Sequence, residues 1–331
     1  MRRLGQVFDE LCSYGNLVLA FAGVQRGRRY REDIRAFQGS LTEELGRLRT
    51  ELLSGTFAFG AYRQFRVYDP KERLISAAPV RERVVHHAII QVCGERLERS
   101  LIDDTYACRK GKGQFQALAR AEHFARHHEW SLKLDMRHYF DSIDHEVMLS
   151  ALRRRLKDAR LLRLLEQLVR SYETTAGKGM PIGNLTSQYF ANLYLDPVDR
   201  LATSVGGRGY VRYMDDILVF GAHEELRGLL REVGELARNR LRLELKGGGS
   251  LQPVARGVDF LGFRVRPGSV TLARDSRRRV RRRVGWLQEA LATGRLTEYD
   301  YQSRLQAVFA HLAHGDTWRF RSALVSRMDL P

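Results

Sequence analysis

The stretch "VRYMDDILVFG" (residues 211–221) places two adjacent aspartates, Asp215 and Asp216, between runs of strand-forming residues. Apolar and polar residues alternate around them, as in two short strands joined by a tight turn. The pattern therefore predicts a β-hairpin with both carboxylates at an exposed tip. Two carboxylates this close repel each other, and a divalent cation relieves the repulsion. Because Mg²⁺ prefers carboxylate oxygens and leaves positions open for substrate phosphates, the stretch predicts a metal site.

The segment "SLKLDMRHYFDSIDH" (residues 131–145) offers a third metal-binding carboxylate. Asp135 follows the strand-like "LKL", at the point where a strand is expected to end. Asp144 precedes a helical pattern, which favours a structural role as helix N-cap. Asp135 is therefore the best third ligand. Two divalent ions held roughly 3.5–4 Å apart by such residues activate a hydroxyl and stabilise a leaving oxygen in phosphoryl transfer. The alternative interpretation of an adjacent acidic pair is an ordinary acidic turn.

The charge of the chain indicates a polyanionic partner. Its 331 residues include 56 Lys and Arg but only 39 Asp and Glu, which gives a net charge of +17. Nucleic acid is the commonest polyanion, so we expect a nucleic-acid-binding protein. A basic protein without such a partner, or one drawn to anionic membranes, is the alternative. The hydrophobic fraction of 44% is that of a globular protein.

Cysteine usage and hydropathy predict a soluble protein inside the cell. The three cysteines, Cys12, Cys93 and Cys108, are far apart and have no metal-ligand spacing, so we expect reduced thiols. The apolar run "LVLAFAGV" (residues 17–24) is too short to span a bilayer, and no signal segment precedes it. We expect a cytoplasmic location.

Hydrophobic periodicity predicts a mixed α+β fold. Residues 40–55 read as a helix with a capping box from Ser40 to Glu43 and a stop at Gly55. Residues 57–77 read as a strand, a turn and a second strand. Further helices are expected at 81–100, 114–128, 145–172, 185–200 and 224–240, strands at 210–220 and 257–265, and a basic helical tail from 274.

These segments carry a family resemblance. Tyr213-Met214-Asp215-Asp216 resembles the polymerase signature of reverse transcriptases, and Asp135 with Phe140 resembles their first catalytic motif. Other motifs follow in the family's order across about residues 57–265: "KERLISAAPVRERVVHHAI" and "TYACRKGKG" resemble its fingers motifs, "MPIGNLTSQYFANLYL" its nucleotide-side motif and "GVDFLGFRV" its primer grip. The resemblance implies an α+β right-hand polymerase. Its expected parts are an N-terminal helical extension (1–56), fingers (57–130), a palm with an antiparallel sheet and finger insertions (131–265) and a helical thumb (266–331).

The resemblance also implies roles for individual residues. Catalysis falls to Asp135, Asp215 and Asp216, and Met136 joins them in binding two Mg²⁺ ions, for which Mn²⁺ is a substitute. Phe140 takes the place of a steric gate that excludes a ribose 2′-hydroxyl, so the expected substrates are deoxynucleoside triphosphates. The full set of expected nucleotide-binding residues is Lys71, Arg73, Phe140, Ile182, Gly183 and Gln188.

Expected nucleic-acid contacts come from basic side chains in two places. Arg109 and Lys110 belong to a fingers motif. In the tail, apolar residues at helical spacing (Val280, Val284, Leu287 and Leu291) predict one buried stripe. The outward arginines of that helix are Arg277, Arg278, Arg281 and Arg282. Such a surface follows the phosphates of an RNA–DNA duplex by charge and shape.

One departure from the common family pattern indicates the subfamily. Ile182-Gly183 and Ser187-Gln188 stand where most reverse transcriptases have Gln-Gly and Ser-Pro, and resemble the enzymes of bacterial and phage diversity-generating retroelements. This resemblance implies error-prone complementary DNA, made from a template RNA, with errors concentrated at template adenines, for mutagenic retrohoming. It also implies a small basic oligomeric accessory protein as partner. The alternatives are a retron or abortive-infection (defence) reverse transcriptase, and a non-catalytic RNA-binding scaffold.

Overall fold

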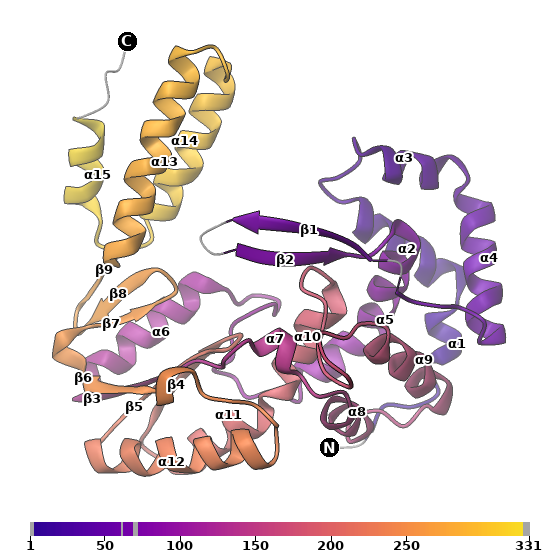
Figure 1. Cartoon of the computed structure of the whole chain (residues 1–331), viewed down its shortest axis with the longest axis horizontal. Helices are drawn as coiled ribbons and strands as arrows, with labels where there is room; N and C mark the ends of the chain where they lie inside the picture. Colours follow the sequence, from indigo (N-terminus) through magenta and orange to yellow (C-terminus); the bar gives the residue numbers. More distant parts are fainter. Residues whose placement is uncertain (1–2, 61, 69–71, 327–331) are drawn as a thin grey trace. The chain divides into compact units, whose positions relative to one another are not determined.

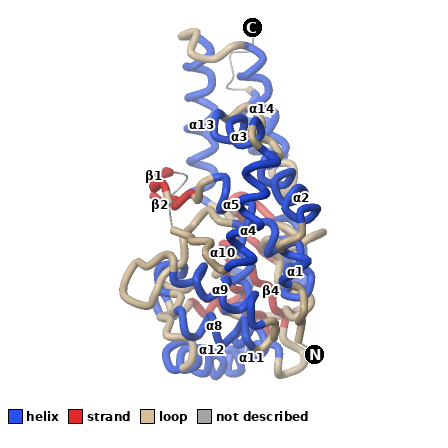
Figure 2. Tube along the Cα trace, turned by 90° about the vertical axis from the view of Figure 1, so that its right-hand side faces the viewer, coloured by secondary structure: helices blue, strands red, loops and turns tan. Residues whose placement is uncertain are grey.

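The computed structural model describes residues 3–60, 62–68 and 72–326, so the predicted nucleotide-binding residue Lys71 lies outside the described residues. The chain divides into two compact units, which are described separately. The first contains residues 1–109, 136–201 and 232–246, and the second contains residues 110–135, 202–231 and 247–331. Helix, drawn in blue in Figure 2, is the commonest secondary structure.

The first unit is mainly helical (Figure 1). Its helices are α1 (Phe8–Leu11), α2 (Tyr14–Gln25), α3 (Glu32–Gly39), α4 (Leu41–Ser54), α5 (Val80–Glu98), α7 (Tyr139–Ser142), α8 (His145–Arg153), α9 (Ala159–Arg170), α10 (Leu185–Tyr194) and most of α11 (Asp196–Thr203). Helix α4 confirms the prediction, and Gly55 ends it with a left-handed φ of 74°. The predicted capping box is wrong, because the Ser40 side chain forms no capping hydrogen bond.

The predicted single helix over residues 145–172 is wrong, since α8 and α9 are separate helices. The carboxylate of Asp158 accepts hydrogen bonds from the backbone N–H groups of Arg160 (3.0 Å) and Leu161 (3.2 Å) and so begins a new helix. The helix predicted at 185–200 is likewise two, α10 and α11. Pro197 explains this break, because it has no N–H to continue the hydrogen-bond ladder.

A two-stranded antiparallel hairpin completes the described elements of the first unit. Strands β1 (Arg63–Tyr68) and β2 (Glu72–Ala77) pair with Tyr68 opposite Glu72. This confirms the two strands predicted within residues 57–77, whereas residues 69–71 of the predicted turn lie outside the described residues. The side chains of β1 are exposed, and those of β2 become buried only toward its end.

The second unit contains a four-stranded antiparallel sheet with the strand order β4-β5-β3-β6. Its strands are β3 (Trp130–Leu134), β4 (Gly209–Tyr213), β5 (Asp216–Gly221) and β6 (Ser250–Pro253). Helix α6 (Gln114–His127) packs against β4 and β5. A Cβ atom on Gly209 would lie 2.4 Å from the Phe124 ring, so only glycine lets this helix approach the strand so closely.

The remaining part of the second unit is a small sheet followed by helices. Strands β7 (Val258–Phe260), β8 (Phe263–Arg266) and β9 (Ser269–Leu272) form an antiparallel sheet, and α13 (Arg274–Ala292), α14 (Glu298–Leu312) and α15 (Trp318–Val325) follow it. The predicted single strand at 257–265 is therefore two, separated by a turn at Leu261 and Gly262, which both have positive φ. Helix α12 (His223–Asn239) begins in the second unit and ends in the first.

The α+β class with an antiparallel sheet and a helical C-terminal part is confirmed. Cys12 and Cys93 are buried, Cys108 is partly buried, and all three are free thiols, as predicted. Within the described part of the chain, no helix combines the length and the apolar character needed to cross a membrane.

Candidate active site

The "YMDD" hairpin forms as predicted. Tyr213 pairs with Asp216, so Met214 and Asp215 make a two-residue loop between β4 and β5. Met214 has a φ of 55°, a left-handed conformation that is uncommon for a residue other than glycine. The side chains of Asp215 and Asp216 are half-buried, so the prediction of an exposed tip is wrong.

A buried arginine supports this turn. Arg212 is completely buried, and its Nη1 atom donates a hydrogen bond to the carbonyl oxygen of Met214, 3.0 Å away. A guanidinium away from water requires such partners, because an unpaired buried charge is costly. Arg212 therefore fixes the backbone on which Asp215 stands.

The three predicted aspartates come together at one end of the sheet. Strand β3 pairs with β5 so that Leu134 opposes Ile217, and the next residue along, Asp135, follows toward Asp216. Burial, together with the charges of Asp135 and Asp216, raises the pKa of Asp215 to about 6. The site therefore concentrates negative charge where solvent stabilises it poorly. That these residues bind metal remains a prediction.

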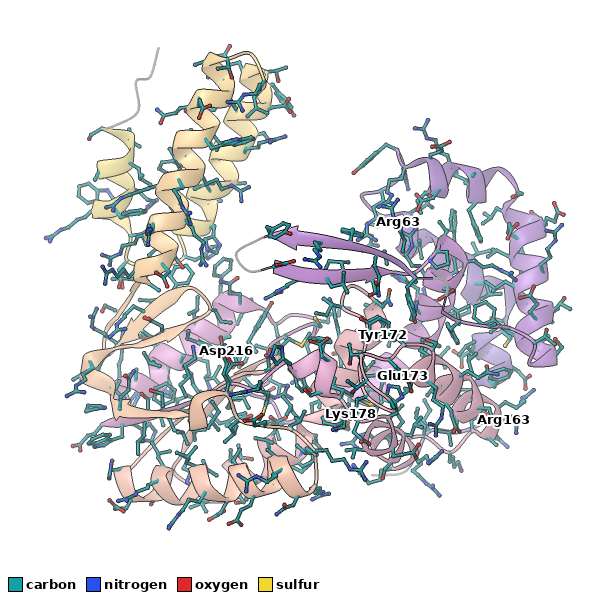
Figure 3. All side chains as sticks on the ribbon, in the orientation of Figure 1. Arg63, Arg163, Tyr172, Glu173, Lys178 and Asp216 are labelled. Carbon is teal, nitrogen blue, oxygen red and sulfur yellow. The ribbon has the colours of Figure 1, made fainter. Side chains whose placement is uncertain are left out.

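Lys133, which is not among the residues predicted from the sequence, faces the same site. Burial raises the pKa of Asp216, and the ammonium of Lys133 opposes that shift from a distance of 3.3 Å (Nζ to Oδ1). The backbone N–H of Leu261 also donates to Asp216, whose side chain is labelled in Figure 3. Lys133 stands two residues before Asp135, and residues two apart in a strand point to the same face. The strand alternation in "LKLD" could therefore have predicted that Lys133 lies on the same face as Asp135.

The acidic cluster of Asp135, Asp215 and Asp216 suits a cation, but it does not form a complete metal-binding site by itself. Oδ1 of Asp216 is buried and forms no hydrogen bond of normal geometry with the described residues; Lys133 approaches it only as an ion pair. Among the described residues, no group of three or more acidic, histidine or cysteine side chains is already arranged to hold a metal ion. Mg²⁺ is commonly bound through one or two carboxylates, water and substrate phosphates, so this donor set suits it.

The predicted nucleotide-binding loop belongs to the first unit, where it packs against β2. The carbonyl oxygen of Ile182 accepts a hydrogen bond from the Ser76 N–H at 3.0 Å. Gly183 has a φ of 115°, and a Cβ atom there would lie 3.0 Å from Cγ2 of Ile75. Glycine is therefore required for the backbone conformation, and its approach to a nucleotide remains a prediction.

The other expected nucleotide contacts of the first unit lie in different environments. Arg73 is exposed on β2, whereas Phe140 is half-buried in α7. Oε1 of Gln188 accepts a hydrogen bond from Sγ of Cys108 at 3.2 Å, which fixes the amide. Met136 is buried and bridges Leu245 through the backbone. Their roles toward a nucleotide or metal remain predictions.

The predicted nucleic-acid residues show two kinds of surroundings. On α13, Val284 and Leu287 are buried but Val280 and Leu291 are half-buried, so the predicted apolar stripe is confirmed in its central part. The predicted outward arginines of this helix are exposed: Arg277, Arg278, Arg281 and Arg282. Elsewhere, Nη1 of Arg109 donates to the carbonyls of Ile102 (2.7 Å) and Thr105 (3.0 Å), which gives this arginine a structural role. Its neighbour Lys110 is exposed.

Comparison with known proteins agrees with this geometry. The family profile described as "Reverse transcriptase (RNA-dependent DNA polymerase)" matches residues 69–265. The chain is 25% identical over 278 residues to Protein YkfC of Escherichia coli, covering 69% of this chain and 72% of that protein. It is 21% identical over 292 residues to a COX1/OXI3 intron 2 protein of Saccharomyces cerevisiae, covering 67% of this chain.

The match to the yeast intron protein spans only 34% of that protein's length, about a third. Among solved structures, telomerase from Candida albicans in complex with a fragment of telomeric RNA matches with a TM-score of 0.46 and 11% identity. That alignment covers 83% of this chain and 56% of the telomerase chain.

Proposed function

Since the chain belongs to the reverse transcriptase family, we propose that it is an RNA-templated DNA polymerase whose catalytic residues are Asp135, Asp215 and Asp216. The observation that carries this proposal is the convergence of three carboxylates, with the pKa of Asp215 raised to about 6. Perturbed carboxylates that converge in this way are typical of catalytic sites. A non-catalytic RNA-binding scaffold would not need to keep all three.

The acidic residues are suited to hold two Mg²⁺ ions, with Met136 contributing beside Asp135. When bound, the ions would polarise the primer hydroxyl and neutralise charge on the triphosphate. The chain's own residues prepare the site for them. Lys133 favours the ionised form of Asp216, and Arg212 holds the turn that presents Asp215.

The nucleotide is proposed to meet residues of the fingers and palm regions. Lys71 and Arg73 supply positive charge for the triphosphate, and Gly183 with Gln188 borders the sugar and base. Phe140 acts as the steric gate, which makes deoxynucleotides the substrates. The proposed fingers, palm and thumb keep the boundaries given by the sequence, with the exposed arginines of α13 and Lys110 contacting the RNA–DNA duplex.

We further propose that the enzyme is of the diversity-generating retroelement type. The supporting observation is the Ile182-Gly183 and Ser187-Gln188 pattern. This would make the complementary DNA error-prone at template adenines, in the cytoplasm of a bacterium, with a structured template RNA and a small basic accessory protein as partners. A retron or defence enzyme would share the chemistry but not the adenine-specific errors.

A short primer-extension assay tests the polymerase proposal. The wild-type chain is given an RNA template, a DNA primer and deoxynucleoside triphosphates with Mg²⁺, Mn²⁺ or EDTA. Extension by a few nucleotides with either metal, and none with EDTA, is expected. Asp135→Ala and Asp215→Ala should abolish extension and leave binding of the same RNA nearly intact, because the basic surfaces bind phosphates. Residual synthesis in either variant would refute the assignment.

A further inference from the structure

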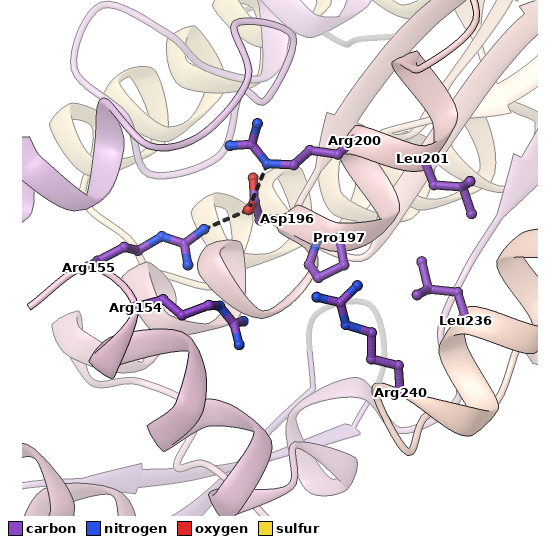
Figure 4. A pocket seen from close by; sticks show the side chains of 8 residues that line it. All are labelled: Arg154, Arg155, Asp196, Pro197, Arg200, Leu201, Leu236 and Arg240. Atoms are coloured by element: carbon purple, nitrogen blue, oxygen red, sulfur yellow. Dashed lines mark hydrogen bonds and ion pairs between the residues drawn. The ribbon is translucent and has the colours of Figure 1, made fainter. Parts of the chain in front are cut away.

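The first unit contains a cavity of about 550 Å³ that is lined by four arginines and one aspartate (Figure 4). We call it the arginine pocket. Its charged residues are Arg154, Arg155, Asp196, Arg200 and Arg240. Arg154 and Arg155 directly follow α8, Asp196 and Arg200 belong to α11, and Arg240 directly follows α12. None of them belongs to the unit that carries the three aspartates.

One half of the arginine pocket is internally neutralised. Oδ2 of Asp196 accepts from Arg155 at 2.6 Å and from Arg200 at 3.0 Å, so a single carboxylate serves two guanidinium groups. Both arginines are also tied to Ser100: Arg155 donates to its hydroxyl (2.9 Å) and Arg200 to its carbonyl (2.7 Å). This side of the pocket is therefore a rigid wall.

The other half carries positive charge without an ion pair of its own. Within the described residues, neither Arg154 nor Arg240 has a carboxylate at ion-pair distance. Arg154 is oriented by Ser150, whose hydroxyl accepts from Nη1 at 3.0 Å. Burial and then the charge of Arg240 lower the pKa of Arg154, and the charge of Asp196 offsets only part of this, so the two cations repel each other. An anion held between them would remove that repulsion.

The rest of the lining suits a nucleotide unit rather than a bare ion. Pro197, Leu201 and Leu236 add apolar surface to the pocket. A second cavity of about 280 Å³ shares Arg154, Pro197 and Arg240 and so extends the same hollow. The volume falls within the range of small-ligand sites. Guanidinium groups bind phosphate through paired hydrogen bonds, and an apolar surface accepts a ribose or base.

We propose that the arginine pocket binds a phosphate–ribose segment of RNA, outside the polymerase active site. A phosphate would lie at Arg154 and Arg240, and the ribose and base would lie against the apolar lining. The choice of RNA rests on the proposed function, because a polymerase that copies RNA meets this polyanion. An acidic peptide is the competing ligand, and its binding is an outcome of the test.

Binding measurements on two double variants test the proposal. Arg154→Gln/Arg240→Gln removes the unpaired charges of the pocket, and Arg227→Gln/Arg231→Gln removes equal charge from exposed positions of α12. The probe is a mixed-sequence single-stranded RNA of about 20 nucleotides, followed by fluorescence anisotropy at several salt concentrations. The pocket variant should bind about fivefold to tenfold more weakly, with a salt slope reduced by about one to two, and the control should change little. Equal losses in both variants would overturn the proposal.

Arginine footprinting of the wild-type chain gives an independent readout. Phenylglyoxal modification of Arg154 and Arg240, mapped by mass spectrometry, should fall when the RNA is present, whereas Arg227 and Arg231 stay reactive. Protection by a polyglutamate peptide but not by RNA would overturn the proposal. Primer extension by a few nucleotides should survive in the pocket variant. Absence of synthesis in the wild type, with protection intact, would refute the polymerase function and leave the pocket's ligand unchanged.

Discussion

The ammonium nitrogen of Lys133 lies 3.3 Å from Oδ1 of Asp216 in the acidic cluster. A cation of the protein thus faces the carboxylate that is proposed to bind metal. Burial raises the pKa of Asp216, and Lys133 offsets part of that rise and so favours the ionised carboxylate that a metal ion requires. Because Lys133 also donates to the carbonyl of Asp259 at 2.6 Å, it has a second partner when an ion takes its place.

Replacing Lys133 should move the acidic limb of the pH–activity profile to higher pH. Without the ammonium, burial and Asp135 raise the pKa of Asp216 further, so less of the carboxylate is ionised below neutrality. Lys133→Met should therefore lose activity at pH 6 and recover most of it at pH 8.5, whereas Lys133→Arg keeps the charge and serves as control. Primer extension with saturating Mg²⁺ across pH 5.5–9 measures this. Superimposable profiles would contradict it.

Neutralising Asp215 should stabilise the metal-free protein at neutral pH. Its pKa is about 6 in the folded chain against a usual value of 3.8, so its contribution to stability is present at low pH and is lost as pH rises from about 4 to 6. Asp215→Asn should raise the free energy of unfolding by about 1–3 kcal/mol at pH 7.5 and change it little at pH 4.

Urea unfolding in EDTA at both pH values measures this, with the exposed Asp141→Asn as the matched control. Adding Mg²⁺ should stabilise the wild type more than the Asp215→Asn variant. A variant that is less stable than the wild type at pH 7.5 would show that the Asp215 charge is already compensated.

Loss of Asp158 should destabilise the first unit. Its carboxylate caps α9 and also accepts from the N–H groups of Val7 (2.9 Å) and Phe8 (3.1 Å). Burial tends to raise the pKa of Asp158, but these backbone hydrogen bonds lower it overall. Asp158→Ala should cost about 2–4 kcal/mol near pH 7. The wild-type contribution is lost only as pH falls through the lowered pKa.

Thermal unfolding of Asp158→Ala beside Asp158→Asn separates hydrogen bonding from charge. The amide oxygen of Asn still accepts hydrogen bonds, so this variant should lose less. Equal stability of the alanine variant and the wild type would mean that water replaces the carboxylate at no cost.

Restoring the common glutamine at position 182 should raise fidelity opposite template adenine. The side chain of Ile182 offers no hydrogen bond, whereas its carbonyl is used by Ser76, so the substitution leaves that backbone bond in place. One regained contact is worth about 0.5–1.5 kcal/mol, or roughly threefold to tenfold in the error ratio. Sequencing products copied from one RNA by both proteins decides it. An unchanged adenine error rate would assign the errors to another residue.

The sequence predicted the strands that carry the three aspartates because strand alternation and an acidic turn are local signals. Prediction from the sequence failed where a helix ended although the helical spacing of its apolar residues continued. The helical spacing of leucines continues on both sides of Asp158, which hid the end of α8. Long-range partners were also missed: Leu261 donates to Asp216 from 45 residues away in the chain, and no spacing rule reports such a bond.

The order of the sheet has a consequence for synthesis on the ribosome. Strand β3 pairs with β5 and β6, whose residues are translated much later, and the turn at Leu261 follows later still. Strand β3 and Asp135 therefore leave the ribosome before their partner strands and cannot form the sheet until those strands have emerged. Non-local pairing of this kind folds slowly. The three repelling carboxylates can therefore meet only after β5 has been synthesised, when Lys133 and Arg212 are already part of the chain.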